Sequence, residues 1–308
     1  MAPPPAGAPE LADRAACPLC GGPPVAVVAV EQWEGVAIRV VRCGRCGGGF
    51  STPVPTLAYR RATYRRWSAE DPRATRQAHF GIHQQPRNAA LYRRALRVLA
   101  GAGARGRLLD VGCAGGMALL FAQDFEAVQD GSGWRRRFEA EGLAVNDEEW
   151  SQTSAVTGCP VHRAEDLPGL PDGRFAAVTA FNTLEHVHEP LPLLGELRRV
   201  LAPEGALYVV VPNNAFLFLR LRAGIGRVPG LEPFEHLNHF TPRSLTELLR
   251  RAGFGRVRLL DDAPGGTQGF FHRLGARDVA KWGVFACVGA LTGKRAYWYP
   301  QILALARP

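Results

Sequence analysis

Apolar residues from residue 101 onward alternate between short runs and longer stretches with helical spacing. Runs typical of buried strands lie at 107–111, 125–130, 176–182, 206–212, 256–260 and 299–306. Stretches with apolar side chains at helical spacing lie at 117–125, 134–142, 191–201 and 244–254. This succession predicts an α/β fold, in which helices cover both faces of a mostly parallel sheet.

The first hundred residues follow other patterns and divide into three parts. Residues 1–14 are rich in Pro and Ala, which predicts a disordered tail. Two β-prone runs within 15–55 predict a hairpin. Residues 56–100 form a basic linker that ends in an amphipathic helix at 87–100, packed on the domain at 101–308.

Four cysteines near the N-terminus follow the pattern C-x2-C, a 22-residue spacer and C-x2-C; they are Cys17, Cys20, Cys43 and Cys46. Each pair forms a knuckle in which both sulfurs face one ion, and the hairpin between the pairs completes a zinc ribbon. Alternatively, the four cysteines form disulfides or are unrelated thiols. Disulfides are typical of secreted proteins, however, and no secretion signal is evident in the sequence. Because four thiolates leave no open coordination position, the expected Zn2+ is structural.

The composition, 46% hydrophobic and 21% charged, is that of a globular protein with a sizeable core. Neither a signal peptide nor an apolar run long enough to span a bilayer is evident, so a cytoplasmic location is expected. The formal charge is +9, almost entirely from arginine. Such a charge favours binding to RNA or to an anionic membrane surface. It is equally consistent with an arginine-rich surface that is only solvated.

Arginine and aromatic residues are interleaved in the linker, as Tyr59, Arg60, Arg61, Tyr64, Arg65, Arg66 and Trp67 show. Such a mixture can stack on bases and neutralise phosphates. The alternative is a helical linker whose arginine face is solvated.

The strand at 107–111 ends in Asp110 and is followed by Gly112, Ala114 and Gly116, small residues that let the backbone approach a ligand. Ala114 and Met117 break the dinucleotide fingerprint G-x-G-x-x-G. Asp110 would also repel a pyrophosphate, whereas it suits a ligand with an ammonium group. Asp130, expected at the end of the second strand, is placed to accept hydrogen bonds from ribose hydroxyls.

The segment LLDVGCAGG at 108–116 resembles the first motif of class I S-adenosylmethionine (SAM)-dependent methyltransferases. The resemblance continues in register through 164–213 and 235–254, and the ribbon is similar to one that precedes many bacterial members. It implies a Rossmann-like, seven-stranded sheet with SAM as cofactor. The polar stretch 146–158 departs from the family pattern and is expected to be an insertion around the third strand.

The resemblance also implies roles for individual residues. Asp110 and the backbone of Gly112–Gly116 would hold the amino-acid end of SAM, and Asp130 the ribose. The adenine would be contacted by the loop that holds Glu165 and Asp166, where Arg163 occupies a position that is often Asp in relatives. Asn182, directly after the fourth strand, is a further cofactor-binding candidate.

Methyl transfer needs an acceptor in line with the methyl group and often a base. His186, after the fourth strand, is the first candidate for the base, and a histidine that braces the cofactor loop is the alternative. His236 and His239 are further candidates, inside a 213–240 insertion expected to cover the acceptor. The apolar side chains of this insertion favour a small organic acceptor over an RNA strand.

Three functions remain open at this point. The first is a methyltransferase acting on O, N or C of a small molecule. The second is an rRNA or tRNA base methyltransferase that uses the ribbon and the basic linker to bind RNA. The third is a non-catalytic protein that binds a partner, although a chain without cofactor has no need of both Asp110 and Asp130. The pattern does not specify an oligomeric state.

Overall fold

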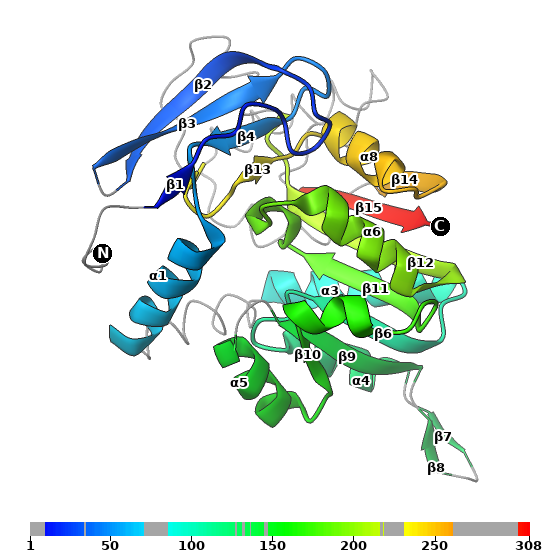
Figure 1. Cartoon of the computed structure of the whole chain (residues 1–308). Coiled ribbons are helices and arrows are strands. Elements are labelled where there is room, and N and C mark those ends of the chain that lie inside the picture. Colours follow the sequence, from blue (N-terminus) through cyan, green and yellow to red (C-terminus); the bar gives the residue numbers. More distant parts are fainter. Residues whose placement is uncertain are drawn as a thin grey trace, which may run out of the picture.

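The computed structural model describes residues 10–33, 35–70, 86–126, 128–130, 133–135, 137–144, 147–215, 218, 231–260 and 301–308. Its centre is a seven-stranded sheet in the order β10-β9-β6-β11-β12-β15-β14 (Figure 1). All neighbours are parallel except β15, which runs antiparallel to both β12 and β14. The strands are β6 (Gly106–Val111), β9 (Phe138–Ala144), β10 (Val161–Arg163), β11 (Phe175–Phe181), β12 (Leu201–Pro212), β14 (Arg256–Leu260) and β15 (Gln301–Arg307).

Helices cover both faces of this sheet, as predicted. They are α3 (Pro86–Gly101), α4 (Met117–Asp124), α5 (Asp147–Thr157), α6 (Pro190–Val200) and α8 (Pro242–Arg251). Leu99 of α3 and Leu119 of α4 share a buried cluster with Tyr208. The next residue along β12, Val209, belongs instead to the cluster that contains α6 and α8. Successive residues of β12 therefore fill two cores on opposite faces.

The sequence-based prediction was wrong between residues 125 and 142. Val128–Asp130 form β7, which pairs with β8 (Gly133–Arg135) in a separate two-stranded hairpin. The second strand of the sheet along the chain is β9, which begins inside the segment 134–142 that was predicted to be a helix. In Figure 1 the β7–β8 hairpin projects from the sheet, away from the N-terminal strands.

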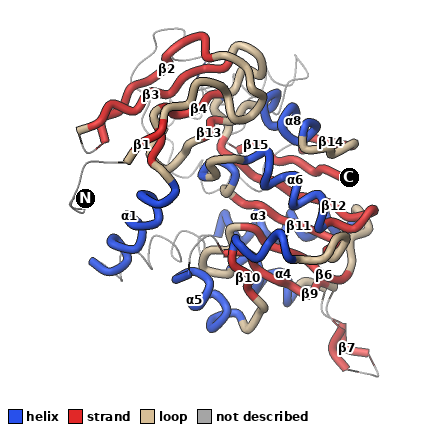
Figure 2. Tube along the Cα trace, in the orientation of Figure 1, coloured by secondary structure: helices blue, strands red, loops and turns tan. Residues whose placement is uncertain are grey.

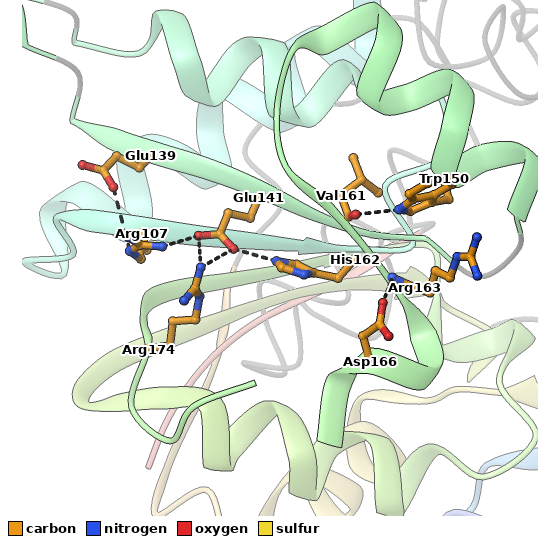
Figure 3. A network of polar contacts seen from close by, with 9 residues as sticks. All are labelled: Arg107, Glu139, Glu141, Trp150, Val161, His162, Arg163, Asp166 and Arg174. Atoms are coloured by element: carbon orange, nitrogen blue, oxygen red, sulfur yellow. Dashed lines mark hydrogen bonds and ion pairs between the residues drawn. The ribbon is translucent and has the colours of Figure 1, made fainter. Parts of the chain in front are cut away.

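Strand β9 escaped prediction because a charged residue lies inside it. Glu141 is buried between β6 and β10, and its carboxylate accepts hydrogen bonds from Arg107, His162 and Arg174 at 2.7 to 3.0 Å (Figure 3). Burial alone would raise the pKa of Glu141, but the hydrogen bonds from His162 and Arg174 outweigh it and lower this pKa to about 2. The ion pairs offset the free-energy cost of burying the Glu141 carboxylate. The residues on either side of it are too small to produce the apolar pattern of a buried strand.

Residues 146–158, expected to be an insertion, contain the regular crossover helix α5 between β9 and β10. Polar residues of this helix form hydrogen bonds to nearby backbone carbonyls. Thr157 donates to the Thr153 carbonyl, and Trp150 donates from Nε1 to the Val161 carbonyl at 2.7 Å (Figure 3). The chain therefore has an ordinary β-α-β connection here rather than an added loop.

The N-terminal strands form a second, antiparallel sheet in the order β13-β4-β3-β2. Figure 2 shows these strands gathered beyond one end of the helix-covered sheet, above α1. The elements are β1 (Leu11–Ala12), β2 (Pro24–Trp33), β3 (Val36–Cys43), β4 (Gly49–Thr52), β5 (Val54–Pro55), α1 (Leu57–Glu70) and β13 (Asn238–His239). Because β13 comes from the 213–240 segment and pairs with β4, the two parts of the chain share a sheet.

The core is also shared between the two parts. Leu19 and Phe50 of the N-terminal sheet belong to the same buried cluster as Phe240 and Leu245. Residues 10–14, expected to belong to a disordered tail, are instead part of the fold, since β1 pairs with β5 and Arg14 donates to two backbone carbonyls; residues 1–9 lie outside the described part. The helix predicted at 87–100 is present as α3, and the linker also contains α1, while residues 71–85 lie outside the described part. None of the described helices is long and apolar enough to cross a membrane.

Candidate active site

The loop after β6 makes a tight turn with three residues in left-handed backbone conformation. These are Gly112 (φ 71°), Ala114 (φ 40°) and Gly116 (φ 74°), and Gly116 caps the start of α4. A glycine adopts this conformation without strain. The loop lies at the carboxyl ends of the strands, where ligands bind in folds of this type.

Two neighbouring elements pack directly on this glycine loop. A Cβ added to Gly112 would lie 2.6 Å from Oγ1 of Thr183, which itself donates to the Val111 carbonyl at 2.9 Å. On the other side, Thr153 of α5 donates from Oγ1 to the Ala114 carbonyl. The sequence analysis did not identify either threonine, because each acts on backbone far away along the chain.

Asp110 is buried, with 3% of its surface exposed, and Thr179 donates to its Oδ1 at 2.6 Å. Burial raises the pKa of Asp110 to about 7, and the Thr179 hydrogen bond opposes this only in part. Tyr92 of α3 lies close enough for the charge of Asp110, added to burial, to raise the tyrosine pKa. A buried carboxylate that is half protonated near neutral pH is stabilised by a cationic ligand.

The structure contradicts the expected position of Asp130. Its backbone pairs with Gly133 in the β7–β8 hairpin, just before β9 begins. Since Phe138 of β9 is opposite Gly106, the first residue of β6, the hairpin adjoins the amino end of the sheet. The glycine loop is at the opposite, carboxyl end. The predicted ribose position instead corresponds to the junction of β9 and α5, where α5 begins at Asp147.

The loop after β10 forms the short 3-10 helix η2 (Ala164–Gly169). The Asp166 carboxylate accepts a hydrogen bond from the Arg163 backbone N–H at 3.0 Å, and the Arg163 guanidinium lies 4.6 Å from the centre of the Trp150 ring (Figure 3). Asp166 is thus used as a cap, whereas Glu165 is exposed next to it. Both carboxylates predicted near adenine are therefore exposed, and of the two only Asp166 serves as a cap.

Asn182 follows β11 in left-handed conformation, with φ 48°. Its backbone N–H donates to the Val210 carbonyl at 2.8 Å, and its side-chain Oδ1 accepts from Gln301 of β15 at 3.4 Å. The residue therefore lies at the carboxyl end of β11, beside the glycine loop.

Glu185, His186 and His236 form a cluster, called here the Glu–His–His cluster, whose first member lies two residues after Thr183 along the chain. Glu185 and His186 belong to the 3-10 helix η3 (Leu184–His186), and His236 comes from the 213–240 segment. One potential ligand atom from each residue lies within 4.8 Å of the others. The His186 and His236 rings meet edge to face, with centres 4.8 Å apart.

The state of each group in this cluster follows from its surroundings. Nδ1 of His186 lies 3.0 Å from the Glu235 carbonyl, which can only accept, so Nδ1 carries the proton and Nε2 the lone pair. Burial, with smaller effects of His236 and Arg60, lowers the pKa of His186 to about 3. The Glu185 carboxylate is 1% exposed, and neither oxygen has a hydrogen-bond partner among the described residues. Burial raises the pKa of Glu185 to about 8.

His239 lies outside this cluster, although all three histidines were predicted together. It is fully buried in β13, and its Nε2 lies 3.2 Å from Oγ of Ser51, whose own proton goes to the His236 carbonyl. Burial lowers the pKa of His239 to about 3, so the ring is neutral. This geometry fits a histidine that joins β13 to β4 rather than one that faces an acceptor.

Residues distant in the sequence hold the backbone around the cluster. Arg60 of α1 donates to the His186 carbonyl, and Arg14 donates to the carbonyls of His188 and Leu237. Asn238 donates from Nδ2 to the carbonyls of Leu184 and Val187. The sequence analysis missed these roles because side chains that meet across so many residues leave no local pattern.

The four cysteines predicted to bind zinc are brought together and buried. Sγ of Cys20 lies 3.4 Å from Sγ of Cys43, and Cys17 and Cys46 are 3.8 Å apart. These separations are far longer than a disulfide bond. A tetrahedral ion with Zn–S bonds of about 2.3 Å places its sulfurs about 3.8 Å apart, so the donor set fits zinc.

The model of the methyltransferase domain family matches residues 80–259, more than half of the chain. The chain belongs to this family. The expected class I SAM-dependent methyltransferase fold is thereby confirmed, and the sheet order with one antiparallel strand agrees with it. The acceptor does not follow from family membership, because one fold serves many substrates.

Two curated relatives and one solved structure illustrate the likeness. A probable S-adenosylmethionine-dependent methyltransferase of Mycolicibacterium smegmatis is 34% identical over 37% of this chain and 38% of its own length. A ubiquinone biosynthesis O-methyltransferase of Xanthomonas oryzae pv. oryzae is 33% identical over 35% of this chain and 44% of its own length. The chain thus matches less than half the length of these relatives.

The solved structure is phosphoethanolamine N-methyltransferase 2 of Haemonchus contortus in complex with S-adenosyl-L-methionine. It is 14% identical, with a TM-score of 0.50, and the match covers 83% of this chain and 62% of that one. At this identity the likeness concerns the fold alone.

Proposed function

We propose that this chain transfers the methyl group of SAM to an oxygen, nitrogen or carbon atom of a small-molecule acceptor. The contact between the glycine loop and the loop of the Glu–His–His cluster carries this proposal. Thr183 packs on Gly112, and Glu185 and His186 follow it closely along the chain. A cofactor held by the glycine loop would therefore direct its methyl end toward the cluster.

On the cofactor side, Asp110 and the backbone of Gly112–Gly116 hold the amino-acid end of SAM. Asp147, at the start of α5, replaces Asp130 as the proposed ribose ligand, because it follows the strand next to β6. Glu165 contacts the adenine, and Asn182 adds a polar group beside the glycine loop. These assignments fit the carboxyl-end location of ligands in such sheets.

On the acceptor side, a lone pair of the acceptor attacks the methyl carbon as the bond from carbon to sulfur breaks. S-adenosylhomocysteine leaves with that electron pair, and the acceptor proton passes to a base. His186, the base expected from the sequence, offers the Nε2 lone pair for this purpose. Burial of the cluster favours a small acceptor over an extended polymer.

The four cysteines hold a structural Zn2+ in this proposal, since their sulfur separations suit a closed tetrahedral site. Reduced thiols of this kind are in keeping with the cytoplasmic location expected from the sequence, which stays a prediction.

Calorimetric titration with S-adenosylhomocysteine tests the cofactor site directly. We expect micromolar binding by the zinc-loaded protein, after which acceptors are screened by transfer of labelled methyl groups from SAM. A folded, zinc-loaded protein that fails to bind would contradict the enzyme proposal and favour the non-catalytic, partner-binding alternative.

An RNA acceptor is the second candidate, and exposed arginines of α1 favour it. Arg61 and Arg65 face solvent, whereas Arg60 is turned inward to His186. Binding of RNA that weakens steeply with salt, and that loses part of this dependence in an Arg61→Ala/Arg65→Ala variant, would support this candidate. For a small-molecule enzyme, the same variant leaves cofactor binding and turnover unchanged.

A further inference from the structure

The Glu–His–His cluster combines two imidazoles and one carboxylate, a set that divalent metal ions such as Zn2+ and Co2+ bind. Within the described part of the chain, only this cluster and the four cysteines bring three or more possible ligand atoms within 4.8 Å. The cluster is separate in sequence from the cysteines and lies on the acceptor side of the proposed site. A metal there would have a role different from that of the structural zinc.

The second observation is the buried carboxylate of Glu185. Its side chain is almost completely enclosed, and both oxygens lack a hydrogen-bond partner among the described residues. An unpartnered carboxylate in such surroundings is costly, and folded proteins pair such groups or use them to coordinate metals. A cation placed between Glu185 and the two rings would satisfy it.

The imidazoles are also prepared for coordination. The hydrogen bond from His186 Nδ1 to the Glu235 carbonyl fixes the ring and leaves Nε2 as the donor atom. Metal-ligating histidines commonly have such a partner on the second nitrogen. The backbone is fixed as well, because the Leu237 N–H donates to the Glu185 carbonyl at 2.7 Å.

The charges around the cluster act in both directions. Arg60 approaches from α1 and opposes a cation, while it favours the neutral imidazoles that coordination requires. The Glu232 carboxylate lies 3.9 Å from Nε2 of His236. Glu31 is near enough to Glu232 for burial and the charge of Glu232 together to raise the pKa of Glu31, so both carboxylates add negative charge near the cluster. With Glu185 ionised, the carboxylates outnumber the arginine and the local balance suits a divalent ion.

We propose that Glu185, His186 and His236 bind a divalent metal ion of the Zn2+ or Co2+ type. Three protein ligands leave at least one coordination position open, as in catalytic rather than structural sites. Ligand atoms around a tetrahedral ion lie about 3.4 Å apart, so small side-chain rotations from the present spacing complete the site. With a metal bound, the Nε2 lone pair of His186 would be engaged in coordination, and the ion would take over its role by binding an acceptor oxygen at the open position and lowering the pKa of its proton. This acceptor role rests on the proposed function, whereas metal binding does not.

The test counts metal ions in the full chain. Protein dialysed against Zn2+ and then desalted is analysed by elemental mass spectrometry, and we expect two zinc ions per chain in the wild type. Glu185→Gln and His236→Gln should each retain one, with affinity for the second ion at least about 10-fold weaker, since even outer partners of metal ligands matter this much. Added Co2+ should give weak visible bands without the thiolate charge-transfer absorption of the cysteine site.

Matched controls are Glu189→Gln and His188→Gln, which change the same residue types just outside the cluster. Both should retain two zinc ions. A wild type with a single zinc, or cluster variants that retain two, would overturn the metal site. The same samples are titrated with S-adenosylhomocysteine: binding with one zinc per chain refutes only the metal proposal, and two zinc ions without cofactor binding refute only the proposed function.

Discussion

Asp110 is buried, and this burial raises the pKa of its carboxyl group to about 7. In the cofactor-free protein the protonated form is favoured between the ordinary pKa of 3.8 and this value. Folding therefore retains a proton over that range, and the contribution of Asp110 to the free energy of unfolding falls as pH rises from about 4 to about 7. A ligand with an ammonium group reverses the preference by stabilising the ionised carboxylate.

Binding of S-adenosylhomocysteine should accordingly strengthen as pH rises through about 7 and then level off. Below this pH, about one proton should be released per ligand bound, which calorimetry in two buffers of different ionisation enthalpy measures. In Asp110→Asn the proton release should vanish and binding should be weaker by about 1–3 kcal/mol. An unchanged proton release in that variant would remove Asp110 from the ammonium site.

The two aspartates considered for the ribose provide a second test at this scale. Asp147→Ala should weaken S-adenosylhomocysteine binding by about 1–3 kcal/mol, because it removes charged hydrogen bonds to the ribose. Asp130→Ala is the matched control and should bind as the wild type does, since its backbone lies in the β7–β8 hairpin. A loss of affinity in Asp130→Ala alone would reverse this assignment.

Individual site residues could be predicted where they stand next to a local signal. Asp110 and Gly112 follow an apolar strand, and the paired cysteines follow a fixed spacing. Arg14, Arg60 and Ser51 could not be predicted, because their partners lie more than a hundred residues away. The position of Asp130 was wrong because the strand before it was misplaced.

At the scale of elements, the turn after β6 depends on a single close contact. Gly112→Ala adds strain at a positive φ and a Cβ that overlaps Thr183. We expect a loss of about 1–3 kcal/mol in stability, together with weaker cofactor binding. Denaturant unfolding and ligand titration measure the two effects.

The double variant Gly112→Ala/Thr183→Ala should recover part of this loss, because it removes the overlap and leaves the backbone strain. Thr183→Ala alone serves as the control, since it loses the hydrogen bonds to the Val111 and Phe181 carbonyls without changing Gly112. If the stability losses of the two single variants simply add in the double variant, the close contact between Gly112 and Thr183 is not what makes an alanine at position 112 destabilising.

Whole elements were predicted well where branched aliphatic residues dominate. Strand β12, with Leu207–Val211 buried, and helix α6, with Leu194 and Leu197 buried, match their patterns. Strand β9 did not, because its small residues and Glu141 hide a buried strand that only the ion pairs across β6 and β10 make possible. The pairing of β13 with β4 was equally unpredictable, since two residues carry no periodicity.

At the scale of the whole molecule, one of the two cores beside the central sheet continues from the ribbon into the methyltransferase domain. Removal of zinc by a strong chelator should therefore lower the unfolding temperature of the entire chain in one transition, since metal binding contributes to folding free energy. Differential scanning calorimetry measures this, with Cys20→Ser as a reference that lacks the complete four-cysteine ligand set. A second transition that stays at the original temperature would mean that the two parts unfold independently.

The strand β13 also limits how this protein can be recombined. Along the sequence, the ribbon and the methyltransferase domain look like two independent domains. In the structure, however, the ribbon sheet is completed by a segment nearly two hundred residues downstream. A ribbon transplanted from a relative would need its own matching stretch around residues 231–240, or β4 would be left with an open edge. Since the same stretch carries His236, an exchange of ribbons would also exchange part of the proposed acceptor site.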